Sequence, residues 1–232
     1  MKTIAENVAK IREEIREAAL EAGRDPGEVL LIAATKMNDA SRVQEAIAAG
    51  VDVCGENRVQ EMLGKLALGA YNGAPLHFIG HLQKNKAKQV VGVCELIHSV
   101  DSTDLLQVIS RCAENHGIVQ DVLLEVNIGG EESKSGFSPE QIPDALKFAA
   151  GLSSVRVRGL MAIPPICDLP EKNRPFFLAM RQLFVDNSEK KYDNVSMDFL
   201  SMGMSGDYAE AVRCGATMVR IGTGIFGPRH YT

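Results

Sequence analysis

Short apolar runs alternate with helix-like stretches along most of the chain, with one such pair for roughly every 25 residues. The stretches between the runs begin with residues that cap helices, and several end on glycine, as helices commonly do. The capping residues are Asp39, Asp101, Ser138 and Ser205, and the glycines are Gly50, Gly117, Gly151 and Gly215. The runs themselves cover residues 29–36, 51–57, 76–81, 95–100, 121–128, 155–163, 197–203 and 218–226. Strands that are separated by helices pair in parallel, so the pattern predicts a parallel α/β fold.

Eight strands joined in this way close most simply into a (β/α)8 barrel, that is, a TIM barrel of parallel strands. A doubly wound open sheet is the alternative. No linker rich in proline or serine divides the chain, and the proline-containing loop at 164–173 lies inside one strand–helix repeat. We therefore expect one domain over residues 1–232, with the barrel at about 29–227.

An additional helix is expected before the barrel, at about residues 1–22. Its apolar residues are spaced three or four apart and mark one face of an amphipathic helix. They are Ile4, Val8, Ile11 and Ile15. Acidic residues interrupt this segment, which distinguishes it from a signal peptide, and no apolar run approaches the ~20 residues of a membrane span. We expect a cytoplasmic protein with no membrane partner.

Charge and cysteine content exclude several other classes of protein. The net charge of −5 disfavours nucleic-acid binding, which requires a basic surface. The cluster of Lys84, Lys86 and Lys88 is interpreted as a solvated helix face. The five cysteines are scattered and form no C-x-x-C pair, which argues against a disulfide framework or a zinc site and for a reducing compartment. We expect neither a metal ion nor a nucleic acid as a ligand.

Alternation of side chains along the strands predicts which residues face the inside of the barrel. Lys36 in the first run, Glu125 in the fifth and Arg220 in the last lie on inward faces, whereas the opposite faces are apolar and suited to packing against helices. Functional groups of such barrels lie at the C-terminal ends of the strands. Buried charges are costly unless they are paired, so these three predict an anionic or polar ligand at the barrel mouth. A structural layer of salt bridges is the alternative.

Two glycine-rich segments predict that the ligand carries a phosphate. SMGMSGD at 201–207 leads from a strand into a helix expected to begin near Ser205, and backbone N–H groups at such a helix start bind phosphate. RIGTGIFG at 220–227 ends the last strand with Gly222 and Thr223. Phosphate sites in these barrels are commonly formed by the loops after the seventh and eighth strands. The literal G-x-G-x-x-G within the second segment is not read as a dinucleotide fingerprint, because that motif must precede a helix and further sheet.

Further segments spread over nearly the whole chain carry a resemblance to a known family. They are TK at 35–36, GENRVQE at 55–61, HFIGHLQKNK at 77–86, SVDS at 99–102, NIGGEESKSGF at 127–137, VRGLMAIPP at 157–165, LSMGMSGD at 200–207 and MVRIGTGIFG at 218–227. In order and spacing these resemble the single-domain proteins related to alanine racemase that bind pyridoxal 5′-phosphate (PLP), the PLP homeostasis family. The resemblance implies a barrel that holds PLP as a Schiff base on Lys36. Thr35 before the lysine, MND after it and His81 depart mildly from the family pattern, but none of these changes removes a group that the cofactor needs.

The resemblance also implies roles for other residues. Arg220 would face the pyridine nitrogen of PLP and keep it unprotonated, which makes the ring a weaker electron sink. The phosphate would be held by Ser201, Ser205, Gly222 and Thr223. Asn57 would orient the ring or the Schiff base. Met202 and Met161 are interpreted as apolar contacts, with plain core packing as the alternative. A neutral Lys36 amine is needed for attack on an aldehyde, and burial beside a cation such as Arg220 favours that form.

The leading hypothesis for function is a non-catalytic or barely catalytic PLP-binding protein. It would hold the reactive aldehyde, supply it to apo-enzymes and so take part in intracellular PLP homeostasis. Alanine racemase takes its second base from a separate β-domain, and only six residues follow Phe226 here. No tyrosine among Tyr71, Tyr192, Tyr208 and Tyr231 is evidently placed as a substitute.

Two alternatives and one further hypothesis stay open. One alternative is a PLP-dependent amino-acid racemase whose second base comes from His81 or from a partner subunit. The other is a Schiff-base aldolase that uses Lys36 and the phosphate loops without PLP. Lys134, in the loop after the fifth strand, is a candidate transient acceptor of PLP during transfer, with a solvated loop lysine as the simpler interpretation.

Overall fold

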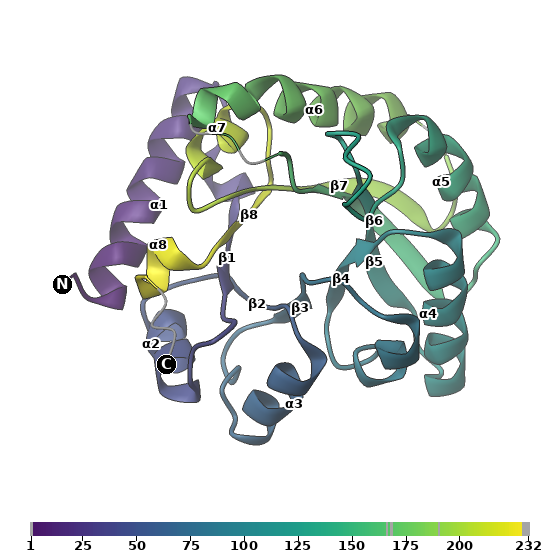
Figure 1. Cartoon of the computed structure of the whole chain (residues 1–232), viewed down its shortest axis with the longest axis horizontal. Helices are drawn as coiled ribbons and strands as arrows, with labels where there is room; N and C mark the ends of the chain where they lie inside the picture. Colours follow the sequence, from purple (N-terminus) through teal and green to yellow (C-terminus); the bar gives the residue numbers. More distant parts are fainter. Residues whose placement is uncertain (1, 166, 168, 190, 229–232) are drawn as a thin grey trace.

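The computed structural model of the protein describes residues 2–165, 167, 169–189 and 191–228. These residues form a closed barrel of eight parallel strands, in which each strand pairs with the next in the chain and β8 pairs with β1. Helices surround the ring of strands on the outside (Figure 1). The prediction of a (β/α)8 barrel is confirmed, and the open sheet is excluded because a closed ring has no edge strands.

The strands and helices follow the predicted order. The strands are β1 (Leu30–Ala34), β2 (Val53–Glu56), β3 (Leu76–Phe78), β4 (Leu96–Val100), β5 (Gln120–Val126), β6 (Val155–Ala162), β7 (Val195–Met204) and β8 (Met218–Ile221). The α-helices are α1 (Ile4–Glu21), α2 (Ala40–Ala48), α3 (Val59–Ala67), α4 (Thr103–His116), α5 (Ile142–Ala150), α6 (Arg174–Ser188), α7 (Tyr208–Arg213) and α8 (Thr223–Phe226). Short 3-10 helices lie at η1 (Pro26–Glu28), η2 (Lys84–Gln89), η3 (Pro139–Gln141) and η4 (Pro170–Asn173).

Several boundaries and one helix type differ from the prediction. The last strand ends at Ile221, and the apolar residues after it turn into α8, whose Ile225 and Phe226 N–H groups donate to the Gly222 carbonyl. The lysine-rich stretch is the 3-10 helix η2 and not an α-helix. Helix α4 is capped by Ser102 instead of Asp101, because the Ser102 hydroxyl accepts from the Leu105 N–H. Helix α7 begins at Tyr208, three residues after the expected start.

The apolar residues form two separate clusters, one inside the barrel and one between the barrel and its helices. The inner cluster consists of Ile32, Val53, Leu96, Leu123, Met161 and Met218. The outer cluster includes the residues that alternate with them along the strands, such as Leu31, Ala33, Val122, Leu124 and Val219. The predicted inward and outward faces are therefore confirmed, and the barrel is filled with side chains as closed barrels of this size are.

Helix α1 covers the outside of the barrel where the last strands meet the first. Its predicted apolar face is buried, with Ile4, Val8, Ile11 and Ile15 at most 5% exposed. Thr3 and Glu6 form a capping box that fixes the start of the helix, and α1 packs against α2, α7 and α8. Within the described ranges, no helix combines the length and the hydropathy that crossing a bilayer requires.

Candidate functional site

Lys36 lies in the turn that directly follows β1, at the C-terminal end of the strand as predicted. Its side chain is half-buried and lines a cavity of about 740 Å³. Gly222, Thr223 and Gly224, where β8 passes into α8, line the same cavity. The fold therefore brings the predicted lysine anchor together with two of the predicted phosphate-binding residues.

Backbone donors beside this cavity converge on one hydroxyl. The N–H groups of Gly222 and Gly224 both donate to Ser205 Oγ, at 3.3 and 3.2 Å. Two N–H groups that point at the same oxygen form a binding arrangement for an anionic oxygen as well. Ser205 lies in the turn between β7 and α7, and Asp207 holds that turn by accepting from the Met204 N–H at 2.7 Å. Asp207 is the N-cap of α7, so the helix begins after Ser205.

Arg220 is the most deeply buried cation of the site, at 4% exposure. Its guanidinium donates to Ser201 Oγ at 2.5 Å and to the Ala162 carbonyl at 3.0 Å. No salt bridge to Arg220 is found among the described residues. Burial lowers the pKa of Arg220 to about 10, against the opposing influence of Glu125 and Asp207, so the group stays charged at neutral pH. A buried cation without an ion pair favours a polar or anionic ligand.

Ser201 links Arg220 to two buried histidines inside the barrel. Ser201 Oγ lies 3.0 Å from His98 Nδ1, and His98 Nε2 lies 3.0 Å from His77 Nδ1. Burial lowers the pKa of His77 to about 4 and that of His98 well below its ordinary value, so both rings are neutral. Ser201 Oγ accepts from Arg220, which can only donate, and is also hydrogen-bonded to His98, whose other ring nitrogen is hydrogen-bonded to His77. Ser201 is thus committed to Arg220 and the histidines rather than to the Gly222–Gly224 donors.

Glu125 faces the same side of the barrel and is half-buried at the end of β5. Burial, together with the nearby charge of Asp101, raises its pKa to about 7, and Arg220 opposes both effects. A carboxyl group with a pKa near neutrality can hold or release a proton under ordinary conditions. The charged layer predicted from strand alternation is therefore present on β5 and β8.

Asn57 supplies an acceptor that the described residues leave unsatisfied. Its Oδ1 is buried and has no hydrogen-bond partner, whereas its backbone N–H donates to Glu56 Oε1 at 3.0 Å. The end of β3 approaches it so closely that a Cβ on Gly80 would lie 2.2 Å from the Asn57 carbonyl oxygen. A buried orphan acceptor in a folded protein calls for a donor, and a bound ligand can supply one.

The two predicted methionine contacts have different positions. Met161 is 1% exposed and belongs to the inner cluster of the barrel. Met202 is fully buried, but its side chain belongs to the outer cluster between strands and helices. Neighbouring residues on a strand point to opposite faces, and Ser201 points inward, so the Met202 side chain points outward. For Met202 the contacts therefore support the alternative of core packing.

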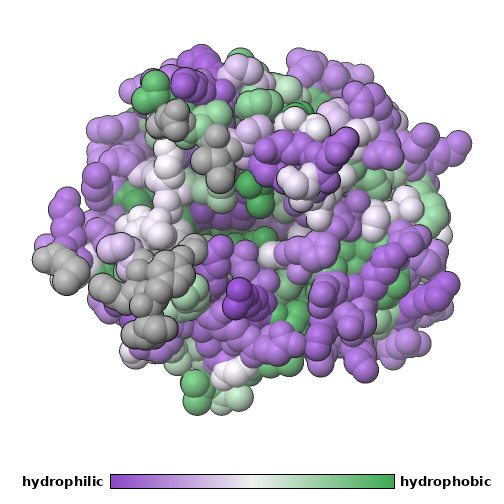
Figure 2. Space-filling model, in the orientation of Figure 1, coloured by the Kyte–Doolittle hydropathy of each residue, from purple (hydrophilic) through white to green (hydrophobic). Residues whose placement is uncertain are grey.

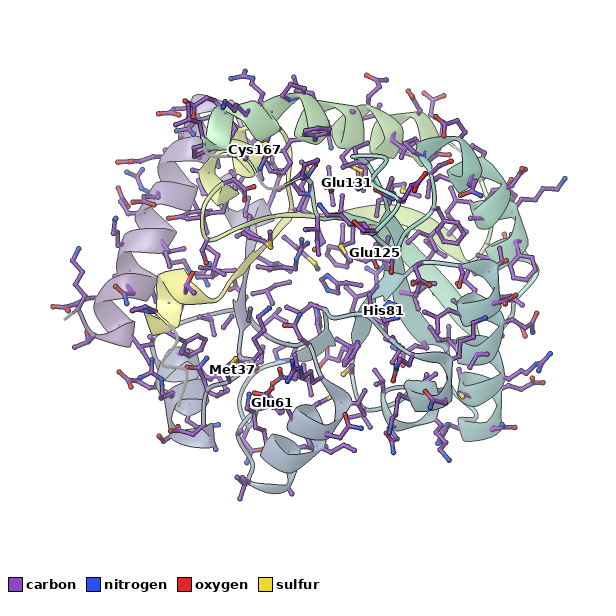
Figure 3. The ribbon with its side chains drawn as sticks, viewed as in Figure 1. Met37, Glu61, His81, Glu125, Glu131 and Cys167 are labelled. Carbon is purple, nitrogen blue, oxygen red and sulfur yellow. The ribbon has the colours of Figure 1, made fainter. Side chains whose placement is uncertain are left out.

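His81 and Lys134 lie at the rim of the mouth. Figure 3 shows His81 and Glu131, the ion-pair partner of Lys134, on the loops that follow their strands. His81 is exposed, with its Nδ1 3.4 Å from Asp101 Oδ2 and 3.4 Å from Ser135 Oγ. Lys134 also donates to the Pro164 carbonyl at 3.2 Å. Tyr231, one of the tyrosines considered above, lies outside the described residues. Figure 2 shows a hollow at the centre of this face, with hydrophobic residues inside a largely hydrophilic rim.

Sequence reasoning missed a buried ionic cluster beside the Lys36 turn. It joins Lys65 and Glu61 of α3 to Glu56 at the end of β2. A signal for it exists in the sequence, because Lys65 follows Met62 by three residues and so falls on the apolar face of its helix. No group of histidine, cysteine or acidic side chains arranged for a metal ion occurs in the part of the chain that the structure covers.

Comparison with known proteins gives consistent matches over the whole chain. The family model described as alanine racemase, N-terminal domain, matches residues 2–230. The chain is 43% identical over 226 residues to a pyridoxal phosphate homeostasis protein of Aquifex aeolicus, covering 97% of this chain and 98% of that protein. A pyridoxal phosphate homeostasis protein of Pseudomonas aeruginosa is 43% identical over 231 residues, covering 100% and 98%. The structure of PipY of Synechococcus elongatus with PLP bound is similar with a TM-score of 0.83 and 33% identity, covering 97% of this chain and 100% of that one.

Proposed function

This chain belongs to the alanine racemase N-terminal-domain family and, within it, to the pyridoxal phosphate homeostasis proteins, and on that premise we propose that it carries PLP on Lys36. The observation that supports this proposal most directly is the shared cavity, which is lined both by Lys36 and by Gly222 and Gly224, whose N–H groups converge on one oxygen. PLP has the two matching groups, an aldehyde and a phosphate. When bound, it supplies an aldehyde that condenses with an amine and a ring that withdraws electrons.

The other residues of the mouth have complementary roles in this proposal. Gly222, Thr223 and Ser205 hold the phosphate through N–H and hydroxyl groups. Arg220 faces the pyridine nitrogen, and Ser201 holds the guanidinium in place from inside the barrel. Asn57 offers its unsatisfied Oδ1 to a donor on the bound molecule. An arginine cannot accept a hydrogen bond from a protonated ring nitrogen, as an aspartate can. The ring nitrogen therefore stays unprotonated, and the ring is a weak electron sink.

Weak electron withdrawal favours a carrier over an enzyme. A racemase would also need a second base, such as a tyrosine. Two tyrosines of this chain, Tyr71 and Tyr208, are instead committed to structural contacts. The Tyr71 hydroxyl donates to the buried Glu56, and the Tyr208 hydroxyl donates to Glu14 of α1. Burial raises the pKa of both phenols, so both hydroxyls keep their protons at neutral pH and neither is available as a base. We therefore propose that the protein binds PLP without turning over an amino acid at an appreciable rate.

A carrier of this kind keeps a reactive aldehyde bound and releases it where it is needed. The partners that we propose are PLP-dependent apo-enzymes in the cytoplasm. Lys134, half-buried at the rim and paired with Glu131, is a second amine that accepts PLP on its way out in this scheme. Slower transfer from a Lys134→Ala protein that binds PLP normally would support that role, and an unchanged transfer rate would remove it.

The absorption spectrum of the purified protein tests the proposal. We expect a visible band from the Schiff base in the wild type with PLP, and no such band in Lys36→Ala. Lys88→Ala, a change of an exposed lysine on η2, is the matched control and should keep the band. A wild type without the band would refute the proposed anchor. Racemisation of an amino acid with a kcat of order 1 s⁻¹ or more, in the ordinary range of enzymes, would refute the carrier and support the racemase with His81 as a base.

A further inference from the structure

The ionic cluster beside the Lys36 turn is centred on Lys65, which is 7% exposed. The Lys65 ammonium has three protons and donates three hydrogen bonds. Its acceptors are the Thr35 carbonyl at 2.7 Å, Glu56 Oε2 at 2.8 Å and Glu61 Oε1 at 2.7 Å. All three donors of this buried cation are therefore satisfied, as a buried charge requires.

Glu56 is fully buried and is just as completely bonded. Its Oε2 accepts from Lys65, from the Thr35 hydroxyl at 3.0 Å and from the Tyr71 hydroxyl at 3.1 Å. Its Oε1 accepts from the Asn57 N–H at 3.0 Å. The carboxylate thereby joins the end of β1 to the end of β2, which are the two places where Lys36 and Asn57 lie.

The cluster holds the backbone on both sides of Lys36. On one side, Lys65 and Glu56 bind the carbonyl and the hydroxyl of Thr35. On the other side, Glu61 Oε1 accepts from the Met37 N–H at 2.5 Å. Figure 3 shows Met37 and Glu61 next to each other, one on the turn after β1 and the other on α3.

Met37 itself shows that the turn is held in a conformation it would not adopt freely. Its φ is +60°, the one positive value at a non-glycine residue within the described ranges. The left-handed region is unfavourable for a side chain such as that of methionine, which is 53% exposed here and has little packing of its own to hold it. The hydrogen bond from Met37 to Glu61 is a direct restraint on this turn.

We infer that Lys65 and Glu61 are positioning residues for Lys36: they hold the turn after β1 so that the lysine amine stands ready for an aldehyde. The inference rests on the proposed function. In the covalent step, the Lys36 amine attacks the aldehyde carbon, a C=N bond forms, and the aldehyde oxygen leaves as one molecule of water. Because the turn is already ordered in the folded protein, PLP binding does not have to order it. The free energy of binding therefore includes no entropy cost for this turn.

The affinities for two ligands distinguish a role of the cluster in positioning Lys36 from a role in supporting the whole site. PLP forms the covalent link to Lys36, whereas pyridoxine 5′-phosphate has the same ring and phosphate but no aldehyde. We expect Glu61→Ala to weaken PLP binding by about tenfold, the effect of one or two lost hydrogen bonds, and to change pyridoxine 5′-phosphate binding by less than about twofold. Affinities are measured by titration of the full-length protein, with the visible band as a second readout for PLP.

Further variants keep the test decisive. Glu61→Gln retains an acceptor oxygen for Met37 and should restore most of the PLP affinity. Lys65→Met should show the same selective loss as Glu61→Ala, and if it fails to fold, the Glu61 variants still decide the matter, because the Glu61 side chain is 23% exposed and tolerates change more easily. The matched controls are Lys88→Met and Glu114→Ala, both changes of exposed residues, and these should bind both ligands as the wild type does.

The outcomes are distinguishable. Equal weakening for both ligands would make the cluster a general support of the fold and overturn the inference, as would unchanged PLP binding in Glu61→Ala. A wild type that binds both ligands equally and shows no visible band would instead refute the proposed Schiff base on Lys36 itself.

Discussion

Arg220 and Glu125 carry opposite charges at the mouth of the barrel, yet no salt bridge between them occurs among the described residues. Each influences the other at longer range, since Glu125 raises the pKa of Arg220 and Arg220 lowers that of Glu125. Burial acts against both charges and is the larger influence in each case. A site built in this way keeps a permanent cation beside a carboxyl group that titrates near neutrality.

The raised pKa of Glu125 predicts a specific dependence of stability on pH. Its pKa is about 7 in the folded protein, above its ordinary value of 4.5. Between these values the folded state binds more protons than the unfolded state, so the free energy of unfolding falls as pH rises. The stability from protonated Glu125 is fully present below about pH 4.5 and is lost as pH rises through about 7.

Glu125→Gln removes this dependence. Relative to the wild type, we expect its free energy of unfolding to increase by about 2–3 kcal/mol between pH 4 and pH 8, in the protein without PLP. Urea denaturation at a series of pH values measures the difference. Glu114→Gln, at an exposed position of α4, serves as the control and should follow the wild type. A constant difference between Glu125→Gln and the wild type across this range would show that Glu125 does not titrate near neutrality.

Single residues of the site were predictable where one strand alone determines their direction. Lys36, Glu125 and Arg220 follow from alternation along their own strands, and the inner cluster of apolar residues confirms those faces. The partners of Ser201 and the cluster around Lys65 were not predictable in this way. Both depend on which side chains from distant elements meet. The spacing of Lys65 from Met62 indicates that Lys65 is buried, but it does not specify which groups it meets.

At the scale of the elements, the functional end of the barrel depends on how closely neighbouring strands approach. Gly80, after β3, lies against the backbone of Asn57, after β2. A Cβ at Gly80 would come within 2.6 Å of the Asn57 Cα as well as 2.2 Å of its carbonyl oxygen. Backbone atoms cannot yield as the end of a flexible side chain can.

Gly80→Ala should therefore destabilise the protein and displace Asn57. We expect a loss of about 1–3 kcal/mol in the free energy of unfolding, the usual cost of forcing extra atoms into a packed region. Gly64→Ala is the matched control, because Gly64 is exposed in the middle of α3 and a Cβ there meets no atom within 4 Å. It should stabilise the protein by up to about 1 kcal/mol. Equal stabilities for the two variants in urea denaturation would contradict the close approach of these strand ends.

Two of the element boundaries that differed from prediction have separate local causes. The apolar run at 218–226 is compatible with either a strand or a short buried helix, and composition alone does not separate the two. The turn at Gly222 divides it, so that the backbone donors near the cavity come from the start of a helix. Ser205 was expected as a helix cap because serine favours that position, but the N-cap of α7 is Asp207, and its side chain accepts from the Met204 N–H in the preceding turn.

At the scale of the whole molecule, the alternation of strands and helices was sufficient to predict the closed barrel. The same alternation predicted the end at which the site lies, because all strands run parallel and their C-terminal ends meet at one face. The alternation alone does not place a ligand within that face. The cavity that Lys36 lines is formed where α1, α2 and α8 come together.

Binding of PLP should stabilise the entire barrel, because the proposed contacts come from the first two strands and the last two strands of the chain. At a free concentration of 100 times Kd, PLP adds about 2.7 kcal/mol to the free energy of unfolding. For a chain of this length the melting temperature should rise by about 5–10 °C. At the same PLP concentration, Lys36→Ala should show a smaller rise in melting temperature, because it retains only the non-covalent contacts and so binds PLP more weakly. An equal rise in both proteins would indicate that the lysine contributes nothing to binding.

Covalent attachment at a defined lysine can be observed directly by reduction with borohydride. The wild-type protein loaded with PLP is treated with sodium borohydride, which converts the C=N bond to a stable amine, and the digested protein is analysed by mass spectrometry. We expect the pyridoxyl phosphate group on the peptide that contains Lys36, at close to one group per chain. A label on a different lysine, or a protein that binds PLP and yields no labelled peptide, would contradict the proposal that this amine at the end of β1 carries the cofactor.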